Sequence, residues 1–349
     1  MQGSMSRRNF ASLALLAGSA LALPVVHAQA KPEKSRLIIG VDGKQALSYL
    51  PLTIADQLGF FRAEGVDVQI SDFADAAAAS QAMLSGLADV CSGAFERTLL
   101  MQAKSRMFKA FVLQGMTPQI AFGASTRSLP NYAAIAELKG KKLGIPALDS
   151  TAGIIVQLLL KRGGLDMSEV SLVPVGSPAN ALSALRTGQI DALGHTDPVI
   201  TQLEQKSEIK IISDTRTLKG TTDLFGGAMP SACLFAAAEF VQKNPKTCQA
   251  LTNALVHSLK WLQTAGPSDI IRTIPESYLF GDRGLYLASF NKIRQAISSD
   301  GLIPDEGPAT ALRALVEIDP ALPLALAKID VSKTYTNEFV RLAKIRFKV

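Results

Sequence analysis

Short apolar runs that alternate with amphipathic stretches predict a βαβαβ unit in the first third of the chain. The runs at 36–42, 66–73 and 88–94 have the length and composition of strands. Between them, the stretches at 51–65 and 75–86 carry apolar residues every three or four positions and end in glycine, as helices commonly do. This order of patterns is typical of a parallel sheet with helical crossovers.

The same order of patterns begins again after residue 140 and predicts a second unit. Apolar runs at 141–147, 170–176 and 189–195 have the character of strands. The helical stretches at 149–164 and 177–188 begin with residues that favour helix N-termini, Asp or Ser, in one case followed by Pro. We therefore expect an α/β protein with two lobes, each built on a βαβαβ-based sheet flanked by helices.

Two similar phrases, SQAMLSGLADV and LSALRTGQIDA, occupy equivalent places in the two predicted units. Each has the end of an apolar helix, a glycine, two further residues, and an aspartate at the turn into a strand. Gly86 and Gly188 can end a helix because glycine adopts positive φ at low cost. Asp89 and Asp191 follow at the same spacing. We favour internal duplication; the alternative is chance, since helix–glycine–strand turns are common in α/β proteins.

Two apolar segments, at 109–125 and 226–240, lie between the predicted units and are interrupted by Gly or Pro. The remainder, 244–349, has mostly helical patterns and no third series of strands. The chain is therefore expected to leave lobe 1, build lobe 2 and return through two hinge crossings, with the C-terminal helices completing lobe 1. We assign 31–123 and 233–349 to lobe 1, and 124–232 to lobe 2.

The N-terminal segment 1–30 has the three parts of a secretory signal peptide. Arg7 and Arg8 form a basic region, 11–26 is apolar, and small residues stand at positions 28 and 30. The paired arginines also resemble a twin-arginine signal, so either export route is open. The apolar run is shorter than the about 20 residues of a spanning helix, which makes a membrane anchor the weaker alternative. We expect cleavage and a periplasmic protein.

Composition excludes several classes of function. The chain has 36 Lys and Arg against 30 Asp and Glu, a mild surplus without a basic block, so nucleic acid is not an expected partner. Its three cysteines are far apart and its histidines number three, which does not suit a zinc site or a disulfide framework. We expect small buried thiols, with a single disulfide as the alternative, and neither a metal nor another cofactor.

Ligands of open parallel sheets bind beyond the carboxyl ends of the strands, so the loops at those ends should face a cleft between the lobes. Hydroxyl side chains and helix N-termini in these loops suit a small anion, although the same residues cap helices in any α/β protein. The candidate ligand-binding residues are Lys44, Tyr49, Asp75, Ser92, Phe95, Glu96, Gly115, Met116, Ser150, Thr151, His195, Thr196, Asp197 and Gly227.

Helix capping explains four of these candidates less easily, namely Lys44, Tyr49, Phe95 and Glu96. Lys44 could pair with an acid, and the rings of Tyr49 and Phe95 could stack on a ligand. Glu96 argues against a site made solely for anions, because it could accept a hydrogen bond from an amine or hydroxyl, or simply pair with a base of the protein. His195 at a strand end could be a general base, a metal ligand or a hydrogen-bond donor; we favour ligand contact or a local hydrogen bond.

The segments LPLTIADQLGFFRAEGVDVQI, ELKGKKLGIPALDSTAGIIVQLLLKRGG and NALSALRTGQIDALGHTDPVI resemble the periplasmic solute-binding proteins of ABC importers, of the nitrate/sulfonate/taurine type. That family also includes binding proteins for pyrimidine precursors of thiamine. The resemblance covers about 36–265 and implies the type II periplasmic-binding-protein fold. It further implies a monomer that closes on a solute by hinge bending and delivers it to a membrane permease and its ATPase.

The resemblance leaves the solute open. We expect a small organic anion, a sulfonate or carboxylate, because the hydroxyl side chains and helix N-termini of the cleft loops suit one. A pyrimidine precursor is less expected, because the cysteine-rich CCCFC motif of those members is missing. An enzyme on the same fold is the alternative, either desulfinase-like with a cleft cysteine or similar to a pyrimidine-precursor synthase. Cys91 and His195, from opposite lobes, could in principle meet across the cleft for such chemistry. An export signal favours binding over catalysis, so we expect no catalytic residue.

Overall fold

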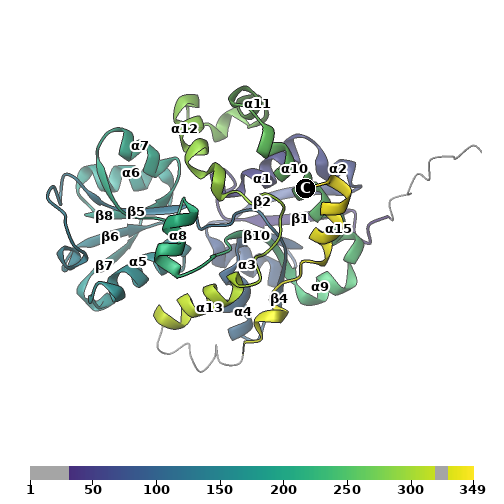
Figure 1. The fold of residues 1–349 in the computed structure, drawn as a ribbon, viewed down its shortest axis with the longest axis horizontal. Coiled ribbons are helices and arrows are strands. Elements are labelled where there is room, and N and C mark those ends of the chain that lie inside the picture. The colour runs from purple at the N-terminus through teal and green to yellow at the C-terminus, as the bar shows by residue number, and fades with distance from the viewer. Residues whose placement is uncertain (1–30, 319–328) are drawn as a thin grey trace, which may run out of the picture. The chain divides into compact units, whose positions relative to one another are not determined.

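The computed structural model describes residues 31–318 and 329–349, which contain two five-stranded sheets (Figure 1). The signal peptide predicted at 1–30 lies outside the described residues. The first sheet has the strand order β2-β1-β3-β10-β4, and β10 runs antiparallel to both of its neighbours. Its strands are β1 (Arg36–Val41), β2 (Asp67–Asp72), β3 (Val90–Ala94), β4 (Phe108–Leu113) and β10 (Ala232–Ala237).

The second sheet repeats this topology with the order β7-β6-β8-β5-β9. Its fourth strand is again antiparallel to both neighbours, as in the first sheet. The duplication predicted from the repeated phrase is therefore confirmed. The strands are β5 (Ile120–Ser125), β6 (Lys142–Ile145), β7 (Ser171–Pro174), β8 (Ala192–Thr196) and β9 (Ile209–Asp214).

The repeated aspartate has the same structural role in both sheets. An Asp89 carboxylate oxygen accepts a hydrogen bond from the backbone N–H of Ile38 on β1 at 3.0 Å. Asp191 accepts the equivalent bond from Lys142 on β6 at 2.9 Å. The glycine three residues before each aspartate has φ of 78° or 79°, the left-handed conformation that ends the preceding helix. The shared spacing thus fixes where the third strand of each unit meets the first.

Helices flank both sheets, and most lie where the apolar periodicity predicts them. One expected helix, 51–65, is divided into two because Gly59 has a φ of 71° and interrupts the helical backbone. The helices of lobe 1 are α1 (Leu50–Gln57), α2 (Phe60–Ala63), α3 (Ala76–Leu84) and α4 (Glu96–Ala103), and those of lobe 2 are α5 (Thr151–Arg162), α6 (Pro178–Thr187), α7 (Val199–Gln205) and α8 (Leu218–Phe225).

Two crossing segments join the sheets, one after β4 and one before β10. Backbone N–H groups of Gln114 and Gly115 donate to the carbonyl of Ala232 at 2.7 and 3.0 Å, and Ser231 donates back to Gly115 at 3.0 Å. The two crossings therefore lie side by side. Since β5 is paired entirely within the second sheet, the boundary expected at 123/124 falls inside this strand.

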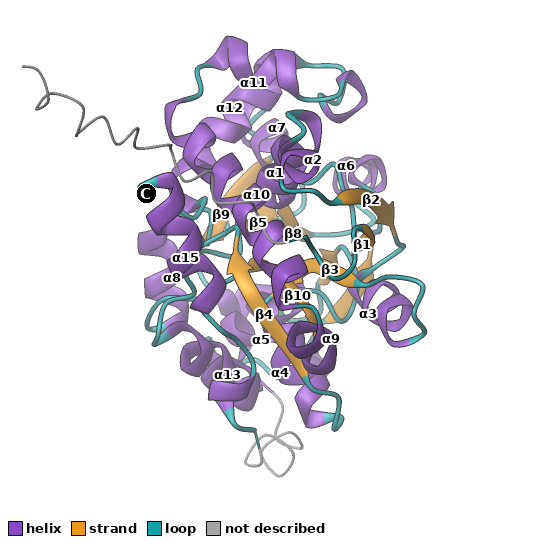
Figure 2. Ribbon diagram, turned by 90° about the vertical axis from the view of Figure 1, so that its right-hand side faces the viewer, coloured by secondary structure: helices purple, strands orange, loops and turns teal. Residues whose placement is uncertain are grey.

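The C-terminal helices pack on lobe 1, and two of them also contact lobe 2 (Figure 2). Helices α10 and α15 lie against β4, whereas α13 contacts α5 and α12 contacts α7. Ion pairs support both of these contacts, Arg162 with Glu317 at 2.7 Å and Lys292 with Glu204 at 2.5 Å. These helices are α9 (Ala238–Lys243), α10 (Pro245–Thr264), α11 (Pro267–Thr273), α12 (Arg283–Ile293), α13 (Gly307–Ile318) and α15 (Glu338–Phe347).

Within 31–318 and 329–349, no helix combines the length and the apolar character needed to traverse a bilayer.

Gly220→Ala is expected to destabilise the protein by about 1–3 kcal/mol, although alanine favours helices by about 1 kcal/mol over glycine. A Cβ at Gly220 on α8 would lie 1.9 Å from the backbone carbonyl oxygen of Asp214, so the helix must shift. Gly284→Ala on α12 is the control, since the nearest atom to its added Cβ is a side-chain oxygen at 3.3 Å. Urea unfolding midpoints measure both; equal stability of Gly220→Ala and the native protein would contradict the clash.

Candidate ligand-binding site

A cavity of about 480 Å³ is lined by residues of both lobes and lies at the carboxyl ends of their parallel strands. Its lining includes residues directly after β1, β2 and β3 in lobe 1, and after β6, β7 and β8 in lobe 2. Both crossing segments also contribute, through Pro118 and Ser231. The volume is within the range of about 300–1,000 Å³ that is usual for small-molecule sites. This is the position that the strand pattern predicts for a ligand.

Half of the candidate residues named from the sequence line this cavity. They come from the loops after β2, β6 and β8 and from the segment after β1. The candidates that line it are Tyr49, Asp75, Ser150, Thr151, His195, Thr196 and Asp197.

The other candidates do not line the cavity, and three of them lie in or behind its lobe 1 wall. Phe95 is fully buried in the hydrophobic core, where its ring contacts Tyr335 edge-on. Ser92 is buried and accepts a hydrogen bond from the Gln114 amide at 2.9 Å. Glu96 is buried behind the lining and accepts a hydrogen bond from a hydroxyl of the opposite lobe.

The remaining four candidates are held by local backbone structure or by packing. The backbone N–H of Lys44 donates to Asp72, which holds its loop. Gly115 and Met116 belong to the first crossing segment; Met116 donates its N–H to the carbonyl of Ala296. Gly227 faces α13, because a Cβ there would lie 3.1 Å from the Thr310 hydroxyl. Their sequence positions are near the cleft, but their contacts are structural.

Several lining residues were not among the candidates. Asp42 and Asp72 are the residues at the ends of β1 and β2, so the rule that marks strand ends could have selected them. Arg97 lay within a predicted cleft loop, and Ser177 was interpreted both as a helix cap and as a hydroxyl donor for a ligand, but neither was chosen as a candidate. Phe280 comes from the C-terminal helical region, which carries no strand-end signal, and only the tertiary structure brings it to the cavity.

The lobe 2 wall presents hydrogen-bond donors to the cavity. Helices α5 and α6 both begin at the lining, and their N-terminal N–H groups give that wall a partial positive charge. The caps Ser150 and Ser177 accept the N–H groups of Gly153 and Asn180, each at 3.3 Å, so these two residues also fulfil the capping role foreseen for them. The hydroxyl of Thr196 lies at the same edge.

His195 adds a buried donor to this wall. It is only 5% exposed, and its Nδ1 accepts the backbone N–H of Thr196 at 2.9 Å. This contact is shorter than the 3.2 Å between Nδ1 and the Thr196 carbonyl oxygen, and because an N–H can only donate, it favours the neutral tautomer with its proton on Nε2. Nε2 is buried and has no hydrogen-bond partner within the described residues. Burial lowers the pKa of His195 to about 4, against weaker opposing effects of the Thr196 and Gly176 backbone, so the ring is neutral at physiological pH.

The lobe 1 wall is acidic. Asp42, Asp72 and Asp75 line it and receive hydrogen bonds from neutral donors: the Tyr49 hydroxyl for Asp42, backbone N–H groups of the β1 loop for Asp72, and the N–H of Ala78 for Asp75. Burial raises the pKa of Asp42 to about 6, and the charge of Asp72 adds to this, whereas the Tyr49 hydroxyl and the charge of Arg97 lower it.

Direct contacts join the two lobes beside the cavity. Arg97, at the start of α4, donates to the backbone carbonyl and the carboxylate of Asp149 at 2.6 and 3.0 Å. The hydroxyl of Thr151 donates to Glu96 at 2.5 Å. Burial raises the pKa of Glu96, against the Thr151 hydrogen bond and the charge of Arg97. We call the pairs Arg97–Asp149 and Glu96–Thr151 the interlobe contact.

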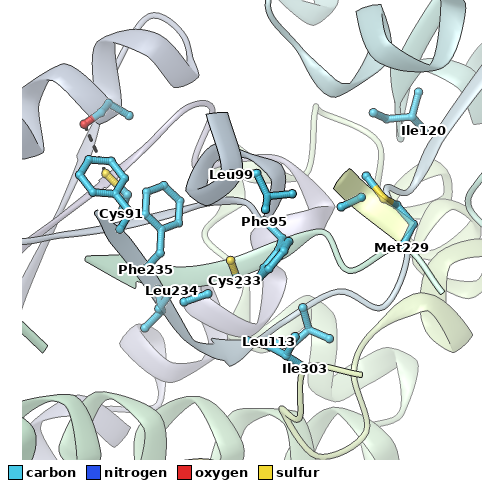
Figure 3. Close-up of a cluster of buried hydrophobic side chains, with 14 of the residues drawn as sticks. Cys91, Phe95, Leu99, Leu113, Ile120, Met229, Cys233, Leu234, Phe235 and Ile303 are labelled. Carbon is cyan, nitrogen blue, oxygen red and sulfur yellow. Dashed lines mark hydrogen bonds between the residues drawn. The ribbon is translucent and has the colours of Figure 1, made fainter. Parts of the chain in front are cut away.

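The three cysteines are free and buried, as the sequence predicted. Figure 3 shows Cys91 and Cys233 among buried hydrophobic side chains. Cys91 is 1% exposed and its thiol donates to the carbonyl of Ala79 at 3.3 Å. Burial raises the pKa of Cys91 to about 12, so the nucleophilic thiolate is not populated at neutral pH. Cys91 is absent from the cavity lining and therefore does not meet His195 across it. Among the described residues there is also no group of three or more side chains suited to a metal ion.

Two lobes of identical topology, with a ligand-sized cavity between their strand ends, define the class of two-lobed solute-binding proteins. The chain belongs to the NMT1/THI5-like family, whose model matches residues 47–267. The resemblance and the two-lobed periplasmic-binding-protein fold predicted from the sequence are confirmed.

Solved structures of several relatives share this fold. A protein of Bordetella bronchiseptica RB50 is 48% identical; the match covers 91% of this chain and 100% of that one, with a TM-score of 0.87. The alkanesulfonate-binding protein SsuA from Xanthomonas axonopodis pv. citri, bound to MOPS, is 17% identical, with coverage of 88% and 99% and a TM-score of 0.64. The desulfurization enzyme DSZB is 16% identical, with coverage of 89% and 100% and a TM-score of 0.57.

A protein of Brucella abortus (strain 2308), named as a candidate binding protein, is 23% identical over 219 residues. That match covers 62% of this chain and 64% of the relative, so the chain spans less than two thirds of that relative's length.

Proposed function

We propose that this protein is the extracytoplasmic solute-binding component of an ABC importer and that it binds a small organic solute in the interlobe cavity. The solute carries an anionic or hydrogen-bond-accepting group, a sulfonate or carboxylate, that faces lobe 2. Delivery to a membrane permease and its ATPase follows, with the protein acting as a monomer after removal of its signal peptide. The fold, the family and the named binding proteins among the relatives support this proposal.

The observation that carries the proposal is the unpartnered Nε2 donor of His195. A buried polar group without a partner costs free energy, so its retention calls for a ligand that completes its hydrogen bond. The N-termini of α5 and α6 reach the same cavity and add N–H donors and partial positive charge. This wall is therefore suited to the oxygen atoms of an acid group.

The apolar part of the lining supports an organic solute over an inorganic anion. The rings of Phe73 and Phe280 line the cavity together with Tyr49, Ile120 and Val199. A volume of about 480 Å³ is far larger than an ion such as nitrate needs. Aromatic and aliphatic side chains stabilise the body of a ligand by burying it, while a few polar groups set its orientation.

An enzyme on this fold is the second candidate function, and one neighbour of known structure is a desulfurization enzyme. The cysteine version of this candidate is not favoured, because the thiol of Cys91 is buried away from the cavity and remains protonated. Binding without chemistry is the function that the cavity supports best.

The test is a thermal-shift screen of the mature protein over sulfonates, aromatic and aliphatic carboxylates, nitrate and pyrimidines, followed by calorimetric titration. A bound solute raises the melting temperature because it stabilises the native state only. A rise with organic acids and none with nitrate is the expected result. The absence of any shift across the organic acids would overturn the proposal.

His195→Phe is expected to weaken binding of such an acid about tenfold, because one buried hydrogen bond to a charged group is lost. His195→Gln keeps an N–H donor and should retain more of the affinity. His257→Phe is the matched control, since His257 stacks between Phe60 and Phe347, far from the cavity lining. Calorimetry measures all three variants; an unchanged dissociation constant in His195→Phe would remove His195 from the site.

A further inference from the structure

We propose that the solute also carries a basic or N–H-donating nitrogen, which Asp42 binds on the lobe 1 wall. This inference rests on the proposed function and extends it from an organic acid to an amino acid-like or amino-heterocyclic acid. It concerns the lobe 1 wall, which lies opposite His195. A solute with only an acid group would leave the carboxylates of this wall without a partner.

The distribution of charge around the cavity carries the inference. Five aspartates and one arginine line it among the described residues. On lobe 2, each acid faces a guanidinium: Asp149 pairs with Arg97 at 3.0 Å and Asp197 with Arg216 at 3.3 Å. On lobe 1, Asp42, Asp72 and Asp75 have only neutral hydrogen-bond donors. The uncompensated negative charge is therefore concentrated on one wall.

A solute that is only an anion is repelled by such a wall, since like charges in a water-poor site interact strongly. A solute with a donor nitrogen at one end and an acid group at the other satisfies both walls. The nitrogen faces the carboxylates of lobe 1, and the acid oxygens face Nε2 of His195 and the α5 and α6 N-termini. The aromatic rings of the lining contact the body between the two ends.

Asp42 is the acid best placed to bind the nitrogen. It directly follows β1 at the lining, and the hydroxyl of Tyr49, itself nearly buried, donates to one carboxylate oxygen and orients the group. Asp75 accepts the N–H of Ala78 as the N-cap of α3, and Asp72 holds the loop after β1. Among the described residues, the Asp42 carboxylate caps no helix and holds no other loop, so one of its oxygens remains available to a ligand.

The burial of Asp42 without an ion-pair partner among the described residues also predicts a cost in free energy for the empty protein. The groups that face it are Tyr49, Asp72, Arg97 and the neutral thiol of Cys91. Together these effects raise the pKa of Asp42 from 3.8 to about 6. Between these two pH values the carboxyl is therefore largely protonated in the native state and largely ionised in the unfolded state. The empty protein therefore loses stability as pH rises toward 6, and a bound cationic nitrogen reverses that loss.

The experiment compares matched pairs of organic acids that differ only by an amino group, such as taurine with ethanesulfonate and aminobenzoate with benzoate. The native protein is expected to bind the amino member at least tenfold more tightly. Asp42→Asn should reduce this ratio to near one, because the amino member loses affinity. Asp67→Asn, at an exposed position on β2, is the control that should keep the ratio.

A second readout separates ligand recognition from a merely structural role. Asp42→Asn should raise the melting temperature of the empty protein at neutral pH, and this gain should fade as pH falls below about 6, where the native carboxyl is protonated. A structural role for the charge would instead lower the melting temperature.

The outcomes are distinguishable. If neither member of any pair binds, the proposed function fails and this inference with it. If acids bind with no preference for the amino group, or Asp42→Asn keeps the preference, only this inference is overturned.

Discussion

Arg216→Met is expected to lower the free energy of unfolding by about 3–5 kcal/mol, the cost of leaving buried carboxylates without their cation. Arg216 is 2% exposed and lies in lobe 2, between β9 and α8. Its guanidinium contacts three carboxylates: Asp214 at 2.7 Å, Glu204 at 2.8 Å and Asp197 at 3.3 Å. Asp197 is fully buried as a side chain and depends most on this partner.

Two further variants test that explanation. Combining Arg216→Met with Asp197→Asn should recover part of the lost stability, because the neutral amide no longer needs a cation and still accepts the N–H of Thr201. Arg283→Met is the surface control; its pair with Glu276 is largely exposed and should contribute little. Urea unfolding measures all variants. A loss in Arg216→Met no larger than in the control would show that the cluster is unimportant for stability.

The cluster also predicts the pH dependence of this loss. Burial is the largest single effect and would raise the pKa of Glu204 and Asp214, but the hydrogen bonds and charge of Arg216, together with Lys292, outweigh it and lower both pKa values. A carboxylate whose pKa is lowered by folding stabilises the native state at pH values above the ordinary pKa of that group. This stabilisation is lost as the pH falls through the lowered pKa. The deficit of Arg216→Met should therefore be largest near neutral pH and shrink in acid, as the native carboxylates take up protons.

The duplicated fold could be predicted from the sequence because each unit carries its own local signals. Strand-length apolar runs, capped amphipathic helices and the G-x-x-D turns are readable without tertiary information, and the aspartates indeed bind the first strand of each unit. Strand β9 and helices α4, α7 and α8 were not singled out, because their periodicity is short and weak. The contacts of α12 and α13 with lobe 2 depend on tertiary packing alone.

The site was predictable to the level of loops, not of side chains. Strand ends located the cavity correctly, yet within one loop Ser92 and Phe95 point into the core while Ala94 and Arg97 line the cavity. Ser92 and Ala94 lie on the same side of β3, so their distance from the strand end separates them, and the first turn of α4 separates Phe95 from Arg97. A local pattern reveals neither. The acidity of lobe 1 was also missed, because Asp42 and Asp72 were interpreted only as parts of their strands and Asp75 alone was chosen as a candidate.

Arg97→Met is expected to weaken solute binding about tenfold, because the hydrogen bonds of Arg97 to Asp149 are lost and the Asp149 side chain, which is 44% exposed, keeps the cost to about 1.5 kcal/mol. Arg97 is 8% exposed and bridges the lobes by donating to the Asp149 carbonyl and carboxylate. Removing it weakens the arrangement in which both walls face the solute. It also removes the cation nearest to Asp42 and Glu96, whose pKa values it helps to lower.

Arg106→Met, at an exposed position just after α4 on the same lobe, is the matched control and should bind normally. Spin labels on one exposed residue of each lobe report the interlobe distance, and the buried native cysteines should not react with the label. If Arg97 acts through the interlobe contact, Arg97→Met should broaden the distance distribution and lower affinity together. A loss of affinity with an unchanged distribution of interlobe distances would instead make Arg97 a direct ligand contact. Unchanged affinity would exclude both roles, because Arg97 would then contribute nothing to solute binding.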